Sequence, residues 1–299
     1  NVNGSKLAKL LIPVPPLAEQ RRIVSALDRA LPLVDEIERA QSDLDALQAQ
    51  LRSKVLDLAV RGGLVPQDPA DEPASALLER AREERRALVA AGKARAPKGG
   101  DSLIFRASDG GHYEKRGKKI ERIDVPFELP GGWEWARLGS IVWHRPQIVP
   151  LTTFSYIDIG SIDNARQKLS SSDNYIEAKD APSRARKPVE YGDVLYSTVR
   201  PYLHNACLVD RAFGKPPIAS TGFAAMVCHS SILNAWLLDT LLSPYFDGYA
   251  NAGGNSTGSS YPAINDTALY RGLIPVPPLA EQHRIATKVM QVQAALTNQ

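Results

Sequence analysis

The feature that most constrains this chain is a repeated segment. The ten residues LIPVPPLAEQ occur at positions 11–20 and again at positions 273–282. The likeness extends beyond this stretch, because the apolar residues Ile285 and Val289 take the places of Ile23 and Leu27. Internal repeats are sought first because they report the architecture of a chain most directly. Two copies of one helix are therefore expected to bracket the middle of the molecule.

Residues spaced alternately three and four apart follow the first copy. The series is Leu27, Ala30, Val34, Ile37, Gln41, Leu44, Gln48, Leu51, Val55 and Leu58. This heptad spacing predicts a long coiled-coil helix that ends at Gly62 and Gly63. Two Gln positions in an apolar seam favour one specific partner helix, for which the repeat is the obvious candidate. Pro32 is expected to kink the helix or to break it locally.

A long helix of this kind has two interpretations. An isolated amphipathic stretch is most often a core helix of a bundle. A helix duplicated on both sides of a globular segment favours an arrangement with pseudo-two-fold symmetry instead.

The connector and the middle of the chain follow other patterns. Residues 73–92 predict a second, shorter helix, and a Lys/Gly/Pro-rich linker covers residues 93–100. Strand signals on both sides of the turn at residues 109–111 predict a basic β-hairpin. Its cationic side chains are expected either to lie along a phosphate backbone or to form a solvated hairpin tip; they are Lys115, Arg116, Lys118 and Lys119.

From Trp133 to Gly272 the helical period disappears. Short apolar or alternating runs are separated by Pro, Gly, Ser and Asp, with one expected helix at residues 232–242. The fold class is therefore predicted as α+β, with a globular mixed α/β domain attached to long coiled-coil helices.

Composition and charge restrict the function. The two cysteines, Cys207 and Cys228, form no disulfide framework or zinc motif, which indicates a reducing cytosol. No apolar run is long enough to span a bilayer. The formal net charge is only +3, although residues 93–123 hold nine Lys/Arg against four Asp/Glu. Any DNA binding must therefore depend on local clusters rather than on the overall field.

Motifs of catalysis are missing or poorly placed. The sequence has no dinucleotide fingerprint, no phosphate-binding P-loop, no zinc-deaminase pair and no Asp/Asn-Pro-Pro-aromatic tetrapeptide. The segment 254–258 matches G-x-S-x-G, and Asp266 and His283 follow in the order of a hydrolase triad. A nucleophile elbow requires an apolar strand before the serine and a helix after it. The flanking residues are small and polar, so a Gly/Ser loop is the favoured interpretation.

Several segments together carry a family resemblance. The block IPVPPLAEQ-x-RI leading into a heptad helix resembles the helix start of type I restriction-modification specificity subunits. The stretch FELPGGWEWARLG at residues 127–139 looks like the start of a target-recognition domain in that family, and residues 191–203 and 219–227 resemble its interior strands. This resemblance implies two target-recognition domains in a full subunit, each reading half of a split DNA site. It also implies two antiparallel helices that set the spacing and dock the modification subunits.

The chain differs from this pattern because it contains only one complete recognition domain. We interpret residues 1–16 as the end of a preceding recognition domain and 17–63 as a long spacer helix. A short helix and linker follow at 64–100, the target-recognition domain with its basic hairpin at 101–272, and the start of a second spacer helix at 273–299. The chain is either a fragment or a half-length subunit that forms a homodimer, and the sequence leaves both open.

The resemblance implies a non-catalytic subunit that reads one half of a bipartite site. The expected partners are double-stranded DNA, the modification subunits and, through the complex, the restriction subunit. No cofactor is expected in this chain, since S-adenosylmethionine, ATP and Mg would be held by the partner subunits. The expected location is the cytoplasm. The competing functions are a helical interaction scaffold and a stand-alone DNA-modifying enzyme.

Three clusters of side chains are the candidates for DNA contact. Arginine, asparagine, glutamine and hydroxyl groups recognise base edges, and Lys and Arg hold phosphates. The clusters are Arg184, Arg186 and Lys187 in an expected loop; Arg200, Tyr202 and His204 where a strand ends; and Asn255, Ser256, Ser259 and Tyr261 in the Gly/Ser loop. For each, a solvated or packed side chain is the competing interpretation.

Overall fold

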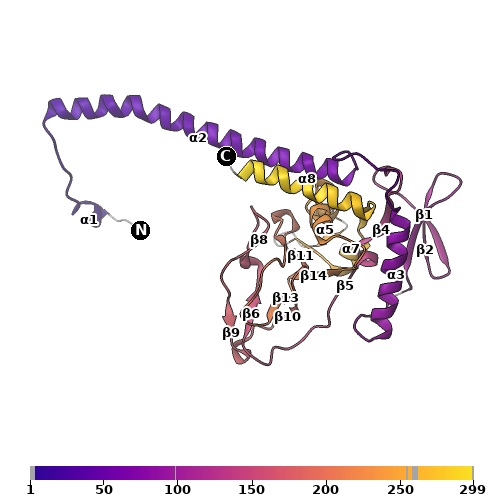
Figure 1. The fold of residues 1–299 in the computed structure, drawn as a ribbon. Coiled ribbons are helices and arrows are strands. Elements are labelled where there is room, and N and C mark those ends of the chain that lie inside the picture. The colour runs from indigo at the N-terminus through magenta and orange to yellow at the C-terminus, as the bar shows by residue number, and fades with distance from the viewer. Residues whose placement is uncertain (1–3, 98, 254, 258–261, 298–299) are drawn as a thin grey trace. The chain divides into compact units, whose positions relative to one another are not determined.

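A computed structural model describes residues 4–97, 99–253, 255–257 and 262–297 (Figure 1). The chain divides into two units, residues 1–51 and residues 52–299. The N-terminal unit contains α1 (Gly4–Leu7) and most of α2 (Leu17–Val60), a helix of 44 residues. The helix continues through Pro32, so the predicted local break is absent.

The second unit contains the end of α2 and all the remaining elements. Its helices are α3 (Ala74–Ala90), α4 (Leu138–Ile141), α5 (Asn234–Leu241), α6 (Pro244–Asn251), α7 (Asp266–Arg271) and α8 (Leu279–Thr297), with 3₁₀ turns η1 (Ile159–Ser161), η2 (Ala178–Asp180) and η3 (Pro201–Leu203). Its strands are β1 (Ser102–Arg106), β2 (His112–Arg116), β3 (Lys119–Ile123), β4 (Glu134–Arg137), β5 (Val142–Trp143), β6 (Phe154–Ile157), β7 (Ile162–Asp163), β8 (Lys168–Leu169), β9 (Tyr175–Ile176), β10 (Ala185–Pro188), β11 (Val194–Ser197), β12 (Ala206–Leu208), β13 (Pro217–Ser220), β14 (Phe223–Cys228), β15 (Ser256–Thr257), β16 (Ala263–Ile264) and β17 (Leu273–Val276).

Two four-stranded sheets form the frame of the globular domain. One has the antiparallel order β12-β11-β14-β5, and the other has the order β10-β13-β6-β9 with a parallel β13–β6 pair. The main core lies between the first sheet and the helices α4 to α7, and its largest side chains include Tyr196, Met226 and Phe246. The predicted α+β class is confirmed.

The basic hairpin has one more strand than predicted. β1, β2 and β3 form a three-stranded antiparallel sheet, and β3 pairs with β2 over five residue pairs. Ile104 of β1 packs with Trp135 and Leu273 in a small apolar cluster, which attaches this sheet to β4 and β17. The third strand was missed because KIERI combines charged and apolar residues without a clear two-residue period.

Both parts of the second repeat, the LIPV segment and the helix that follows it, contribute buried residues. Its LIPV segment forms β17, which pairs with β4 so that Ile274 lies opposite Ala136. The following helix α8 packs Ile285 and Val289 against Val55 and the other buried residues at the end of α2. α8 and this last part of α2 run antiparallel (Figure 1), so the expected contact between the long helix and the repeat is present here.

Two polar side chains at the start of α8 are fully buried and bonded. Glu281 accepts hydrogen bonds from the indole Nε1 of Trp133 at 2.9 Å and from the amide Nε2 of Gln67 at 3.2 Å. Gln282 accepts one from the backbone N–H of Leu233 at 2.8 Å and donates one to the carbonyl of Pro277 at 2.9 Å. These donors surround the start of α8, and we call Trp133, Gln67 and Leu233 the cradle.

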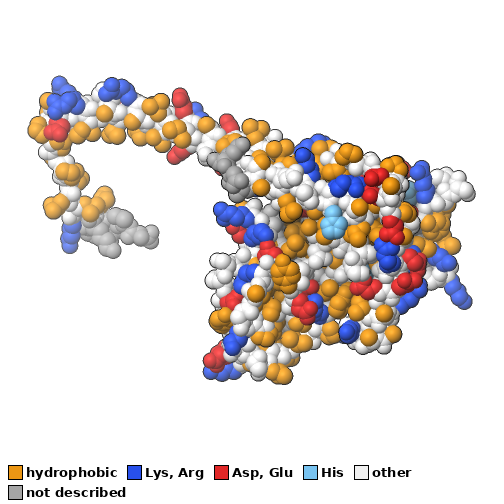
Figure 2. All heavy atoms as spheres, viewed as in Figure 1, with side chains coloured by type: hydrophobic (Ala, Val, Ile, Leu, Met, Phe, Trp, Pro, Cys, Tyr) orange, Lys and Arg blue, Asp and Glu red, His pale blue; other side chains and the backbone are white. Residues whose placement is uncertain are grey.

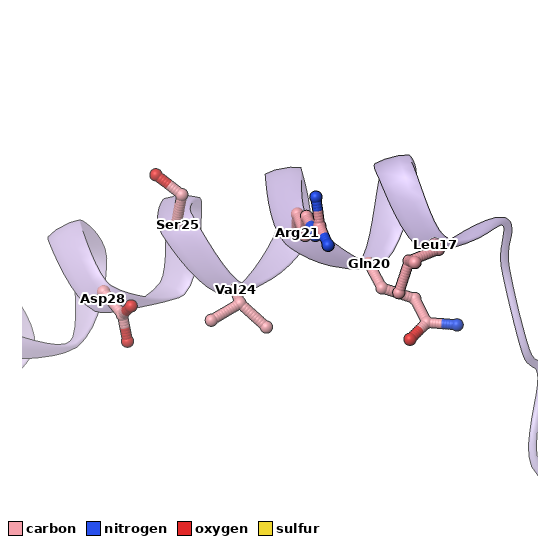
Figure 3. A pocket seen from close by; sticks show the side chains of 6 residues that line it. All are labelled: Leu17, Gln20, Arg21, Val24, Ser25 and Asp28. Atoms are coloured by element: carbon pink, nitrogen blue, oxygen red, sulfur yellow. The ribbon is translucent and has the colours of Figure 1, made fainter.

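The first repeat has the same residues without these neighbours. Gln20 makes the local bond of its counterpart, donating to the carbonyl of Pro15 at 2.8 Å. Its LIPV segment is not a strand, and Leu11 is 99% exposed whereas Leu273 is 9% exposed. Figure 3 shows Leu17, Gln20 and Val24 on one side of the helix, and Figure 2 shows apolar side chains along its surface.

Candidate nucleic-acid interface

The loops that carry two of the predicted clusters are joined by backbone hydrogen bonds. The carbonyl of Arg184 accepts the N–H of Thr221 at 2.8 Å, and the carbonyl of the next residue, Gly222, accepts the N–H of Thr198 at 2.9 Å. Further along, the N–H of Arg200 donates to the carbonyl of Pro262 at 2.7 Å. Segments far apart in the sequence therefore lie side by side. We call the edge formed by residues 184, 198–204, 221–222 and 262 the loop edge.

The second cluster lies on an unusual turn. Arg200 and His204 flank η3 with φ values of 50° and 52°, in the left-handed region that non-glycine residues seldom adopt. Between them, Tyr202 is 48% exposed. The Nε2 of His204 lies 2.9 Å from a carboxylate oxygen of Asp247, which fixes the imidazole ring. The turn thus presents an exposed aromatic ring on a backbone held from both sides.

The first cluster is divided by the fold. Arg184 is exposed, whereas Arg186 and Lys187 lie in β10 and are half-buried. The Nζ of Lys187 donates to the carbonyl of Phe223, and burial lowers the pKa of this ammonium group. Arg186 donates to the carbonyl of its neighbour Ala185 at 3.0 Å. Of the three cations, Arg184 is the one whose side chain is exposed.

The third cluster is described only in part. The side-chain amide of Asn255 donates to the carbonyl of Tyr249 at 2.9 Å, which anchors this residue to the end of α6. Ser256 belongs to β15, which pairs with β16 next to Pro262. Ser259 and Tyr261 lie outside the described residues.

A turn that the sequence analysis did not select also lies on the loop edge. β7 and β8 pair as a short hairpin, and the side-chain amide of Asn164 in its turn donates to the carbonyl of Leu203 at 2.9 Å. The sequence signal was the turn dipeptide Asp163-Asn164 between apolar residues. That signal predicts a turn but gives no reason to place it beside η3, since the contact joins residues distant in the chain.

Three observations concern metal binding, the triad-like residues and membrane insertion. Among the described residues, no group of three or more His, Cys, Asp or Glu side chains is placed to hold a metal ion. Asp266 lies at the start of α7 and His283 is exposed on α8. No helix in the described part of the chain combines the length and apolar character needed to cross a bilayer.

Comparison with known proteins identifies the relatives of this chain. No protein-family model matches it. The specificity subunit of the type I restriction enzyme EcoAI from Escherichia coli is 27% identical over 93% of this chain and 52% of its own length. The chain is homologous to type I restriction enzyme specificity subunits. It spans about half of the length of the EcoAI subunit.

Three further matches agree with this homology. The EcoEI specificity subunit from Escherichia coli is 43% identical over 33% of this chain and 14% of its own length. The crystal structure of the HsdS subunit from Thermoanaerobacter tengcongensis superposes with a TM-score of 0.53 at 36% identity, covering 58% of this chain and 45% of that one. A chain from a structure of type I R-M complex assembly superposes with a TM-score of 0.51 at 37% sequence identity. The match covers 57% of this chain and 44% of that one. The resemblance inferred from the motifs is thus confirmed.

Proposed function

We propose that this chain is a sequence-specific DNA-binding specificity component of a type I restriction-modification complex, without catalytic activity of its own. The observation that carries this proposal is its homology to a specificity subunit over 93% of its length. Its recognition domain reads one half of a bipartite site. Its helices dock the modification subunits, and the restriction subunit joins through that complex.

The loop edge supports DNA recognition in this domain. It displays Arg184, the exposed ring of Tyr202 and the polar β7–β8 turn. Backbone hydrogen bonds join the first two segments, and the side chain of Asn164 joins the turn to η3. Arginine and asparagine pair with base edges in the major groove, and exposed cations contact phosphates. A preorganised edge loses little entropy when it binds, which favours affinity.

We also propose that the first repeat packs against a second recognition domain, of which residues 1–16 are the end. In the second repeat, the cradle buries Glu281 and Gln282, whereas in the first repeat Glu19 is exposed and Gln20 is half-buried. A domain offering an indole N–H, an amide and a backbone N–H in the same arrangement would cover the first repeat. In this chain the cradle is already filled by α8. If the natural subunit is half-length, a second copy supplies the other half-site reader.

The function is tested in the assembled complex. The chain is expressed in the cytoplasm of a host together with its modification subunits, and methylated bases in the host genome are mapped by long-read sequencing. We expect a split motif with a fixed spacer, and inverted identical halves if the chain acts as a homodimer. A stable complex whose methylation is independent of this chain would favour a helical scaffold and contradict the proposal.

Arg184→Ala tests the loop edge separately. Loss of one phosphate contact should weaken binding of the complex to DNA of any sequence and reduce the slope of log K against log salt by about 1. Arg80→Ala is the matched control, because Arg80 is also an exposed arginine and lies on α3, remote in sequence from the loop edge. Equal salt slopes for the two variants would remove Arg184 from the interface.

A further inference from the structure

The β7–β8 turn is held in one conformation by its own carboxylate. One oxygen of Asp163 accepts the backbone N–H groups of Ala165 and Arg166, at 3.0 and 3.1 Å. Gln167 closes the turn with a φ of 51°, and its side-chain amide donates to the carbonyl of Asn164. The tip of this hairpin is therefore a defined structure although it is surrounded by solvent.

The hairpin is also fixed to the domain at three places. Ile162 and Leu169 pack in an apolar cluster beneath it. Lys168 forms an ion pair with Asp210, and Asn164 bonds to the carbonyl of Leu203. These contacts position the tip relative to η3, so the backbone that carries a side chain at the tip is held in one place on the loop edge.

Backbone strain is concentrated at the same place. Among the described residues, the non-glycine residues with positive φ are Gln167, Arg200 and His204. Two of them flank η3 and the third lies in the turn bonded to η3. Left-handed conformations at such residues are energetically costly and are often retained at binding sites.

Arg166 is the side chain that this turn displays. It is 72% exposed, and its Nη1 lies 3.0 Å from the second carboxylate oxygen of Asp163. This bond to Arg166 is the main cause that holds the pKa of Asp163 below its usual value. A carboxylate that binds one edge of a guanidinium orients it and leaves donors for a second acceptor.

We propose that Arg166 is a specificity-determining residue that donates two hydrogen bonds to a guanine in the major groove, with Asp163 as its positioning residue. The fork of a guanidinium matches the O6 and N7 acceptors of guanine, the commonest specific contact between proteins and DNA. This inference rests on the proposed function and assigns base reading to a turn outside the three clusters selected from the sequence.

The test compares variants of the full chain assembled with the modification subunits. Methylated motifs are mapped in the host genome for wild type, Arg166→Ala, Asp163→Asn and the control Arg80→Ala. The probes for binding are duplexes that carry the wild-type motif, with each G·C pair replaced in turn. We expect Arg166→Ala to lose about 10-fold to 100-fold of the discrimination at one G·C pair and to leave the other positions unchanged.

Asp163→Asn separates positioning from contact. The amide keeps an oxygen for the two backbone N–H groups but loses the charge that orients Arg166. We expect partial loss of discrimination at the same G·C pair, with an unchanged thermal midpoint of the chain. Loss at a different pair, or no loss, would contradict the role given to Asp163.

The outcomes distinguish this inference from the proposed function. If wild type methylates a defined motif and Arg166→Ala methylates the same motif with the same discrimination, the base-reading role is wrong. A uniform loss of affinity at all sequences would make Arg166 a phosphate contact and also overturn the inference. If wild type itself shows no motif, the proposed function fails and this inference fails with it.

Discussion

The two repeats are one sequence in two environments. In the second, LIPV is a buried strand paired with β4, and the helix that follows is surrounded by the cradle. In the first, LIPV is exposed and forms no strand, although Gln20 keeps the same local bond to a proline carbonyl. The helix start is therefore set by the peptide itself, whereas the strand and the burial are set by the neighbouring domain.

The largest difference is expected from the apolar residue that faces the cradle. Ile285 is 0% exposed and Ile23, its counterpart, is 45% exposed. Ile285→Ala should lower the free energy of unfolding by about 2–5 kcal/mol, because it leaves a cavity among Trp236, Val55 and Val289. Ile23→Ala should change it by no more than about 0.5 kcal/mol. Urea unfolding of both variants measures the contrast, and equal losses would refute it.

The glutamines should differ by a smaller amount. Gln282→Ala leaves the part-buried backbone N–H of Leu233 without its acceptor and the buried carbonyl of Pro277 without its donor, which should cost about 1–3 kcal/mol. Gln20→Ala removes a single half-buried bond and should cost about 1 kcal/mol or less. The same unfolding experiment reports both values. The distinction fails if Gln20→Ala is as harmful as Gln282→Ala.

Glu281 and its counterpart Glu19 test the comparison of the two repeats through the pH dependence of unfolding. Burial raises the pKa of Glu281, outweighing the hydrogen bonds from Trp133 and Gln67. The native state then keeps this proton at pH values where the unfolded chain has released it, so stability falls as pH rises towards the raised pKa. Glu281→Gln should remove that part of the pH dependence of unfolding. Glu19→Gln, at the exposed counterpart, controls for the loss of one charge, and an identical change in both would contradict the account.

The smallest effect is expected at an ion pair on the rim of the second repeat. Arg284 lies 2.6 Å from a carboxylate oxygen of Asp71, but its side chain is partly exposed and screened by solvent. Arg284→Ala should cost at most about 1 kcal/mol, and less at high salt. Arg22→Ala in the first repeat is the matched control. A cost that salt leaves unchanged would show that packing, rather than charge, holds Arg284.

The sequence predicts the elements with a local period better than their pairing. The heptad spacing locates α2, and the apolar run at residues 232–242 locates α5 at Asn234–Leu241. It does not predict that Leu273 pairs with Arg137, because strand partners far apart in the chain leave no local signal. The short helices α6 and α7 were missed, since proline and glycine nearby suggested loops.

The candidate site was predicted by residue type, and the structure shows how its residues are placed. Arg184 is exposed as the basic cluster suggested, but the neighbouring Lys187 bonds inward to a backbone carbonyl. Because the side chain of Lys187 is bonded to the carbonyl of Phe223, the three cations of this cluster cannot all face one ligand. The β7–β8 turn became a candidate only through its contact with η3.

Hydrogen exchange tests the central claim, that the first repeat is a docking surface for a recognition domain. Backbone exchange is compared at residues 17–24 and 279–286, first in this chain and then in a chain with residues 64–272 duplicated directly before Leu11. The account predicts fast exchange in the first repeat alone, and slow exchange matching the second repeat once the duplicated domain is present. Exchange in the first repeat that stays fast beside the added domain would contradict it.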